Sequence, residues 1–303
     1  MFSIVTACMN RESHLLQSLP RWLQLQAVQE VIVVDWCNAN PLTELTQIDP
    51  RIKVIRVEGE SRWILAYAYN LGIGRAMCDF IVKCDADCVP GRAVEECRPD
   101  GQFFYAGHWK SGAAVGKASV NGQCVVAKWQ FEKVNGYSEI IRTYGRDDED
   151  FYDRLIASGL ARREICPATF DLIAHSDEER MRNQVDSKAV STVEEFLERN
   201  LSYNEMRNYF VGRQMPWGPW FLRASYQREG GGDRFEVVRR NQAVEIRVPP
   251  ALSEAARLFS LRHVVGKAWN LPPAVREKLD ERACVALLVE KLDARPRAVG
   301  GDE

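Results

Sequence analysis

Short apolar runs and helical patterns alternate along the first part of the chain, and this alternation constrains the fold more than any other feature. The strand-like runs are residues 2–8, 30–35, 52–57 and 80–84, and helical patterns occupy residues 15–23 and 63–77. The run that ends at Asp35 is apolar on both faces, which is typical of a strand buried inside a parallel sheet. Strands separated by helices predict an α/β fold with a mostly parallel sheet between helices. Ligands of such sheets bind beyond the carboxyl ends of the strands.

The composition is that of an ordinary globular protein. Its 303 residues, 46% of them hydrophobic, suffice for one large domain or two smaller ones. The net charge of −2 provides no overall field for nucleic acid, so we expect no nucleic-acid partner. We find neither a transmembrane run nor a signal-peptide pattern, and the nine scattered cysteines are typical of reduced thiols, so we predict a cytoplasmic location. Cys84 and Cys88 lack a second pair at zinc-site spacing and are interpreted as buried small residues.

Carboxylates follow two of the predicted strands, at the edge where ligands are expected. Asp35 ends the second run, and Asp85 and Asp87 follow the fourth in an Asp-Ala-Asp sequence. Two carboxylates released from a buried strand can bind a divalent cation whose other positions are filled by phosphate oxygens and water, and such hard ligands suit Mg²⁺ or Mn²⁺. Loops also contain Asp-x-Asp by chance, so both interpretations stay open at this point.

Four consecutive acids at residues 147–150 stand at the start of a helical pattern that Gly159 ends. The free N–H groups in the first turn of a helix favour negative charge. Crowding of carboxylates raises the pKa of at least one of them, and such a group can accept a proton from a bound hydroxyl. The stretch is therefore a candidate base site, with a solvated helix start as the alternative. On this helix Asp148 shares a face with Tyr152 and Ile156, which we expect to pack against the sheet.

The remainder of the chain changes character near residue 186. Before this point, strands are expected at 103–106, 124–127 and 170–175, and a helix at 129–134. The last of these strands ends in His175, and although a lone histidine is more often structural than a ligand, this one accompanies a candidate metal site. We predict one domain over residues 1–186 and a mainly helical C-terminal extension over residues 187–303.

The extension carries no cluster of chemically active residues. Helices are expected at 191–201, 252–269 and 274–292, an aromatic loop at 215–220, a flexible glycine run at 230–232 and a disordered end after Arg295. The last helix carries an apolar stripe of Val275, Leu279, Ala283, Ala286 and Leu287. We predict that this stripe packs on the first domain or forms a homo-oligomer.

Several motifs occur together in one order over roughly residues 1–185. They are a first strand over 3–10, the sequence 33–37, Asn-Leu-Gly at 70–72 before Asp85-Ala86-Asp87, Asn-Gly-Tyr at 135–137 before residues 144–148, and Ile-Ala-His-Ser at 173–176. In this order the chain resembles the glycosyltransferase family 2 type of GT-A fold. Its second half is similar to the catalytic domains of β-1,4-galactosyltransferases and chondroitin polymerases.

The resemblance implies roles for individual residues. It implies that the nucleotide-sugar donor is bound by Thr6, Asp35, Asp85 and Asp87. It implies that the metal ion, Mn²⁺ or Mg²⁺, is bound by Asp87, His175 and Asp85, with Asp87 as a direct ligand. It implies that Asp148 is the catalytic base and that Asp147 and Tyr144 contact the acceptor.

Two positions depart from the galactosyltransferase pattern. Leu172 stands where those enzymes have a methionine metal ligand, and leucine cannot coordinate. Their paired tryptophan-glycine run is reduced to residues 143–146, so the acceptor pocket must differ.

We therefore expect a metal-dependent inverting glycosyltransferase of the hexosyltransferase type that moves a sugar, with a UDP-sugar favoured, to a carbohydrate or other hydroxyl acceptor, as in polysaccharide biosynthesis. One alternative is a sugar-nucleotide pyrophosphorylase, but residues 8–12 are not the glycine-rich basic loop that it needs. Others are a retaining glycosyltransferase and a non-catalytic carbohydrate-binding or scaffold protein, although the latter would be expected to lose the motif acids.

Overall fold

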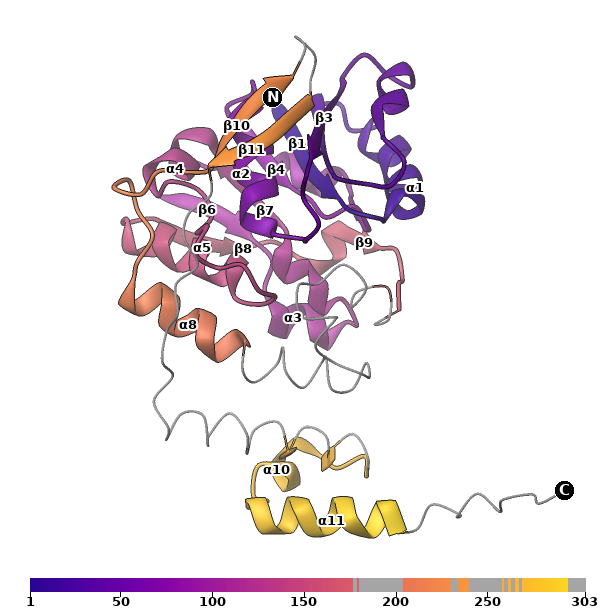
Figure 1. The fold of residues 1–303 in the computed structure, drawn as a ribbon, viewed down its shortest axis with the longest axis vertical. Helices are drawn as coiled ribbons and strands as arrows, with labels where there is room; N and C mark the ends of the chain where they lie inside the picture. Colours follow the sequence, from indigo (N-terminus) through magenta and orange to yellow (C-terminus); the bar gives the residue numbers. More distant parts are fainter. Residues whose placement is uncertain are drawn as a thin grey trace, which may run out of the picture.

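A single nine-stranded sheet organises the chain (Figure 1). The computed structural model describes residues 1–176, 204–229, 234–239 and 269–293, together with positions 179, 258, 261–262 and 265–266. The strands of the sheet are β1 (Phe2–Cys8), β2 (Val28–Trp36), β3 (Ile52–Glu58), β4 (Phe80–Lys83), β6 (Phe103–Ala106), β7 (Cys124–Ala127), β8 (Ala161–Glu164), β10 (Ser225–Glu229) and β11 (Arg234–Arg239).

The strand order is β10-β11-β3-β2-β1-β4-β7-β6-β8. Pairing is parallel from β11 through β3, β2 and β1 to β4, and antiparallel where β7 joins β4 and β6. The edge pair β10 and β11 is antiparallel, and β8 pairs parallel with β6. The prediction of a mostly parallel α/β sheet is confirmed. Because β1, β2 and β4 run in the same direction, their carboxyl ends meet at one edge, where the predicted donor residues lie.

The two faces of the sheet are covered by different helices. Strand β1 alternates, with Val5 and Ala7 in the core on one face and Ile4 and Cys8 in the core on the other. The first face packs against α2 (Leu65–Arg75), α4 (Lys128–Lys133) and α5 (Asp147–Ala157). The second face packs against α1 (Glu12–Trp22), which buries Trp22. Figure 1 shows α1 on one side of the sheet and α4 and α5 on the other.

A second, two-stranded sheet lies beside the main one. It pairs β5 (Cys88–Pro90) with β9 (Phe170–Leu172) in antiparallel fashion. The prediction of a strand over 170–175 was too long, since Leu172 already pairs with Cys88, the first residue of β5, and His175 lies beyond the end of β9. The short helices are α3 (Trp109–Ala114), η1 (Thr43–Gln47), η2 (Arg92–Glu96), η3 (Ala118–Gly122) and η4 (Pro167–Thr169).

Part of the C-terminal third packs on the first domain. Helix α8 (Glu205–Gln214) packs against α5, and Val211 and Trp217 bury themselves against Ile140 and Ile141. Strands β10 and β11 extend the main sheet through β3. The sheet therefore includes residues from beyond the predicted boundary at 186, because the edge of β3 offers free backbone groups to a strand from any part of the chain.

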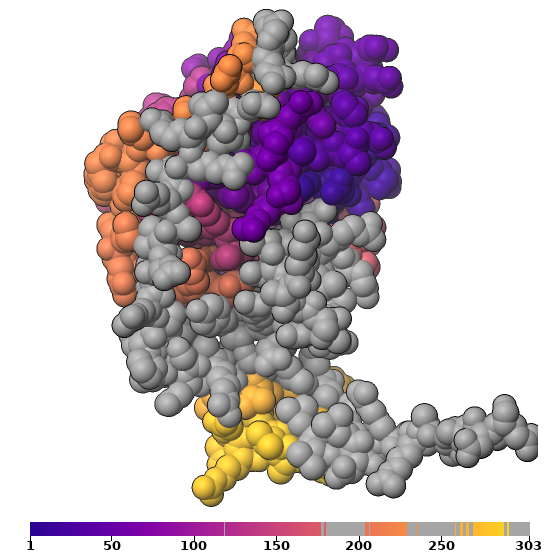
Figure 2. Space-filling view, viewed as in Figure 1, coloured from indigo at the N-terminus to yellow at the C-terminus, as the bar shows by residue number. Residues whose placement is uncertain are grey.

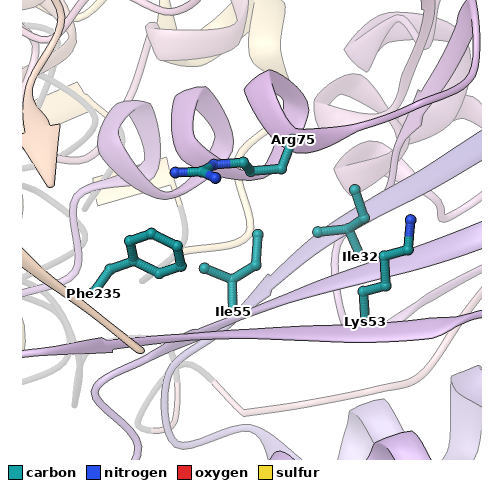
Figure 3. Close-up of a pocket in the computed structure, with 5 residues that line it drawn as sticks. All are labelled: Ile32, Lys53, Ile55, Arg75 and Phe235. Carbon is teal, nitrogen blue, oxygen red and sulfur yellow. The ribbon is translucent and has the colours of Figure 1, made fainter. Parts of the chain in front are cut away.

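A small cavity lies where β11 joins the sheet (Figure 3). It has a volume of about 170 Å³ and is lined by Ile32, Lys53, Ile55, Arg75 and Phe235. Figure 3 shows Arg75 reaching from its helix over Phe235, and the guanidinium lies 4.7 Å from the ring centroid. This contact connects β11 with α2.

The last described helices are α10 (Pro273–Arg276) and α11 (Glu281–Asp293). The single helix predicted at 274–292 was wrong, because the Asp280 side chain accepts a hydrogen bond from the Ala283 N–H at 2.8 Å and starts a new helix. Cys284 is buried, whereas Val275 of the predicted stripe is 47% exposed. Figure 2 shows the residues of α11, in yellow, at the bottom of the view and the indigo and violet N-terminal residues near the top.

Other expectations for this region lie outside the described residues. They are the helix at 191–201, most of the helix at 252–269, the glycine run at 230–232 and the end after Arg295. Within the described parts of the chain, every helix is too short or too polar to cross a membrane. All nine cysteines are free thiols, and Cys84 and Cys88 are buried as predicted.

Candidate active site

The acidic stretch forms the N-terminal turn of α5, as predicted. Gly145 and Arg146 precede it with left-handed backbones, at φ angles of 100° and 62°. This tight turn directs the chain into the helix and is favoured by glycine. Asn208 of α8, which is almost fully buried, donates a hydrogen bond of 2.7 Å to the Gly145 carbonyl. The loop that leads into the acids is thus held by a residue from the C-terminal third.

Asp148 is one of two acids of this turn that are buried, the other being Asp150. The Oδ1 atom of Asp148 accepts a hydrogen bond from the Tyr137 hydroxyl at 3.1 Å and lies 3.4 Å from the Lys83 ammonium. Burial raises the pKa of Asp148 well above its usual value, the Lys83 charge opposes this, and the neighbouring Asp147 adds to it. A carboxylate with a raised pKa is a stronger proton acceptor than a solvated one.

The other acids of the stretch have different surroundings. Burial and then the charge of Glu149 raise the pKa of half-buried Asp147 to about 6, although Lys83 opposes the shift. Asp150 is buried and forms an ion pair of 2.8 Å with Arg154 in the next turn of the helix. Asp150 is therefore a structural residue, whereas Asp147 remains partly accessible beside Asp148.

Two expectations on the surroundings of the acids have different outcomes. Tyr152 packs against the sheet and donates a hydrogen bond to the Asn121 carbonyl at 3.0 Å. Ile156 was expected on the same buried face, but it is 47% exposed. The apolar residues that the helix buries are Phe151, Tyr152 and Leu155, and Ile156 is turned about 100° away from Leu155 around the helix axis. Tyr144, predicted at the acceptor side, is 37% exposed.

Lys83 is a central residue of the site that the sequence interpretation missed. The side chain is fully buried at the end of β4, and its ammonium donates to Asp85 Oδ1 at 2.9 Å and to the Gly122 carbonyl at 2.6 Å. Burial alone would lower its pKa, but the carboxylates of Asp148 and Asp85 outweigh burial and raise it well above the usual value. Its signal in the sequence is a lysine that interrupts an otherwise apolar strand.

The two acids of the Asp-Ala-Asp turn point to different partners. Asp85 accepts hydrogen bonds from Tyr69, Lys83 and Gln123, at 2.9, 2.9 and 2.8 Å. Asp87 Oδ2 instead lies 2.8 Å from Arg11 Nη1 and 2.9 Å from His175 Nε2. Burial alone would raise the pKa of Asp87, but the hydrogen bond with His175 and the charge of Arg11 outweigh it and lower the pKa.

The predicted metal ligands are therefore only partly assembled. Asp87 and His175 are adjacent, but Asp85 is turned toward Lys83, and the described residues contain no group of three His, Cys, Asp or Glu side chains arranged to hold a metal ion. The pair nevertheless fits a cation. A carboxylate oxygen and an imidazole nitrogen are both common metal ligands, and Asp87 and His175 present one of each at the same point.

Two further predicted residues lie at the carboxyl ends of β1 and β2. Asp35 is fully buried, and its carboxylate accepts hydrogen bonds from Asn38, Leu42 and Arg56, between 2.7 and 3.2 Å. In this arrangement Asp35 holds the loop after β2, and its direct contact with a nucleotide stays a prediction. The Thr6 hydroxyl is also buried, and among the described residues it has no hydrogen-bond partner.

Two family profiles match the part of the chain that contains the candidate site. Residues 3–95 match the profile of glycosyl transferase family 2, and residues 114–176 match the N-terminal domain of galactosyltransferase. The two matches include β1 to β4 with the Asp-Ala-Asp turn in one, and α5 with His175 in the other. They confirm the resemblance to glycosyltransferases that was inferred from the motifs.

Individual relatives are distant. The chain is 24% identical to beta-1,4-galactosyltransferase 1 of Bos taurus over 182 residues, which cover 51% of this chain and 45% of the relative. For the Homo sapiens protein the identity is 23% over 175 residues, covering 49% and 44%. The matched region thus spans less than half the length of these relatives. A mannosyltransferase of Pyrobaculum calidifontis, solved with GDP-Man and Mn²⁺, is similar with a TM-score of 0.52 at 12% identity, covering 97% of this chain and 80% of that one, and it confirms the GT-A fold.

Proposed function

We propose that this chain is a metal-dependent inverting glycosyltransferase that transfers a sugar from a nucleotide-sugar donor, with a UDP-sugar favoured, to a hydroxyl group of a carbohydrate acceptor. The observation that carries the proposal is the position of Asp148. It is a buried carboxylate with a raised pKa, and through Lys83 it is joined to the Asp-Ala-Asp turn that would hold the donor.

On the donor side, Thr6, Asp85 and Asp87 would contact the nucleotide-sugar. The buried Thr6 hydroxyl without a partner among the described residues supports this role, because a buried polar group that lacks a hydrogen bond is costly and a ligand can supply the bond. The Asp35 network would keep the loop after β2 in place beneath the nucleotide.

Asp87 and His175 would hold Mn²⁺ or Mg²⁺. When bound, such an ion neutralises the negative charge that develops on the diphosphate as the glycosidic bond breaks. Binding requires the His175 Nε2 lone pair to be available and Arg11 to release Asp87, since Arg11 and the ion would compete for the same carboxylate oxygen. A released Arg11 carries a positive charge that suits a phosphate oxygen.

On the acceptor side, Asp148 would accept the proton of the acceptor hydroxyl while that oxygen attacks the anomeric carbon. Attack from the face opposite the leaving diphosphate inverts the configuration in a single displacement. Half-buried Asp147 and exposed Tyr144 flank this position and would contact the acceptor sugar.

Asp148→Asn tests the proposal. The amide keeps the size of the carboxylate but removes its basicity, so turnover should fall by roughly 10²–10⁴ while nucleotide binding stays near wild type. Asp153→Asn is the matched control, because Asp153 lies on the same helix and is 62% exposed. Near-normal transfer by Asp148→Asn would contradict the assignment of the base.

A screen of nucleotide-sugars with Mn²⁺, followed by NMR, tests the reaction itself. Inversion of the anomeric configuration is expected in the product. Retention would replace the single displacement by a retaining mechanism, and the absence of both hydrolysis and transfer would favour a non-catalytic carbohydrate-binding protein. A thermal-shift comparison of nucleotide diphosphates in the presence of Mn²⁺ tests which nucleotide the donor carries. Stabilisation by GDP or dTDP but not UDP would exclude a UDP-sugar.

For the C-terminal helices we propose a role in packing or homo-oligomerisation. Val275 is 47% and Val285 43% exposed, and both are apolar. Removal of residues 249–303 should lower solubility or change the oligomeric state measured by analytical ultracentrifugation. A folded truncated protein that loses transfer would contradict this proposal.

A further inference from the structure

Lys83 has an environment that a strand lysine rarely has. Its side chain is 0% exposed, and the ring of Tyr69 covers the ammonium at 4.7 Å. Burying a charge without partners is very costly, so the ammonium must be held by groups that compensate it. Those groups are the two carboxylates of Asp85 and Asp148 and the carbonyl oxygen of Gly122. Lys83 thus lies between the Asp-Ala-Asp turn at residues 85–87 and the first turn of α5.

The two carboxylate oxygens of Asp148 have different contacts. Oδ1 receives the Tyr137 hydroxyl and faces the Lys83 ammonium, at 3.1 and 3.4 Å. Oδ2 has no hydrogen bond recorded from any residue that the structure describes. Because one oxygen is fixed from two directions, rotation of the carboxylate is restricted, and the second oxygen keeps its lone pairs for a substrate hydroxyl.

Gly122 leaves room at the point where these groups converge. A Cβ on this residue would lie 3.0 Å from Asp85 Oδ2, 3.3 Å from Asp148 Oδ2 and 3.3 Å from Lys83 Nζ. Asp148 Oδ2, and Asp85 Oδ2 with its hydrogen bond from Gln123, therefore face a common space beside a residue that has no side chain. The ammonium that touches both acids borders the same space.

We propose that Lys83 is a positioning residue that contacts both the Asp148 carboxylate and the Asp85 carboxylate. It thereby fixes the distance between the proposed base, Asp148, and the Asp-Ala-Asp turn before the substrates bind. This inference rests on the proposed function, because it assigns Lys83 a task in the transfer between donor and acceptor. The physical reason is geometric: a base displaced by about 1 Å can cost about 10²-fold in rate. Among the residues that the structure describes, Lys83 alone forms ion pairs with both Asp85 and Asp148.

The test uses Lys83→Met, which removes the charge at similar volume, and Tyr137→Phe, which removes the other contact of the same Asp148 oxygen. For Lys83→Met we expect turnover in transfer to fall by roughly 10²-fold, with the donor KM changed by no more than about threefold. Tyr137→Phe keeps the charge pair and should lose roughly tenfold or less. Far-ultraviolet circular dichroism and thermal unfolding verify that each variant is folded.

A charge-specific readout separates positioning from general packing. In Lys83→Ala, added ethylammonium should restore part of the turnover, whereas ethanol should not. If Lys83→Met does not fold, Lys83→Gln, which keeps a donor for the Gly122 carbonyl, takes its place with the same expected loss. Unchanged turnover in the folded variants, or equal rescue by ethanol, would overturn the proposal.

Failure of the proposed function gives a different pattern. If Asp148→Asn transfers as well as wild type, Asp148 is not the base and the reaction assignment fails. If Asp148→Asn is inactive while Lys83→Met turns over normally, the function stands and only the role of Lys83 is refuted.

Discussion

Replacing Asp35 by alanine separates a structural role from direct contact with a nucleotide. In the structure the carboxylate is fully buried and compensates Arg56 at 2.8 Å, while it also accepts hydrogen bonds from Asn38 and Leu42. Alanine would leave these donors without their acceptor. Breaking a buried ion pair by removing one partner costs about 3–5 kcal/mol.

The contacts that remain set the expected value within this range. Arg56 also donates to the Asn38 carbonyl at 2.8 Å and lies 3.4 Å from Glu58, so its charge would keep some compensation. We therefore expect a loss of about 3 kcal/mol in the free energy of unfolding, equivalent to roughly 5–10 °C in Tm. Glu58→Gln is the matched control, because it removes the half-exposed partner of the same arginine and should cost less than about 1 kcal/mol.

The assay combines urea denaturation with isothermal titration of UDP in the presence of Mn²⁺. Asp35→Ala should show the loss of stability, and nucleotide affinity should fall only at temperatures where the variant begins to unfold. If Asp35→Ala kept its Tm within about 2 °C of wild type but lost nucleotide binding, Asp35 would be a direct ligand, and the structural interpretation would be refuted.

Four further outcomes follow from the geometry of the site. Gly122→Ala should lower transfer roughly 3–10-fold by pressing a methyl group against three charged atoms, while Gly101→Ala, with nothing within 4 Å, should leave it unchanged. Arg11→Gln should raise the affinity for Mn²⁺ alone roughly 3–5-fold in calorimetry, because a competing cation leaves Asp87; weaker binding would show that Arg11 supports the ion. Asn208→Ala should raise the acceptor KM roughly fivefold by loosening the loop before α5, at a cost of about 1–3 kcal/mol; an unchanged acceptor KM would argue against this. Transfer should decline as the pH falls through the raised pKa of Asp148, since the base must be deprotonated; an acid limit below about pH 4, the range of an ordinary carboxyl, would contradict this.

Local sequence patterns determined the central part of the fold. The apolar runs that became β1 to β4 need burial on both faces, and the intervening helices can supply it only in a mostly parallel α/β sheet. The start of α5 at Asp147 was also predictable, because acids are favoured in the first turn of a helix and glycine in the tight turn before it. Both features depend on residues that lie close to one another in the sequence.

Pairing between distant segments was not predictable in the same way. The addition of β10 and β11 to the edge of β3 uses backbone hydrogen bonds, which any strand can make and which leave little trace in side-chain patterns. The break between α10 and α11 likewise depended on Asp280 being available as a cap, within a pattern that reads as one continuous helix.

The order of motifs alone was enough to indicate the similarity to glycosyltransferases and to select the candidate acids. Only the tertiary structure decided what each acid contacts. Asp85 turns to Lys83, Asp87 turns to Arg11 and His175, and Asp148 has one oxygen anchored by Tyr137. A carboxylate becomes a structural ion pair, a metal ligand or a base according to the donors that surround it, and here those donors come from segments far apart in the chain that only folding brings together.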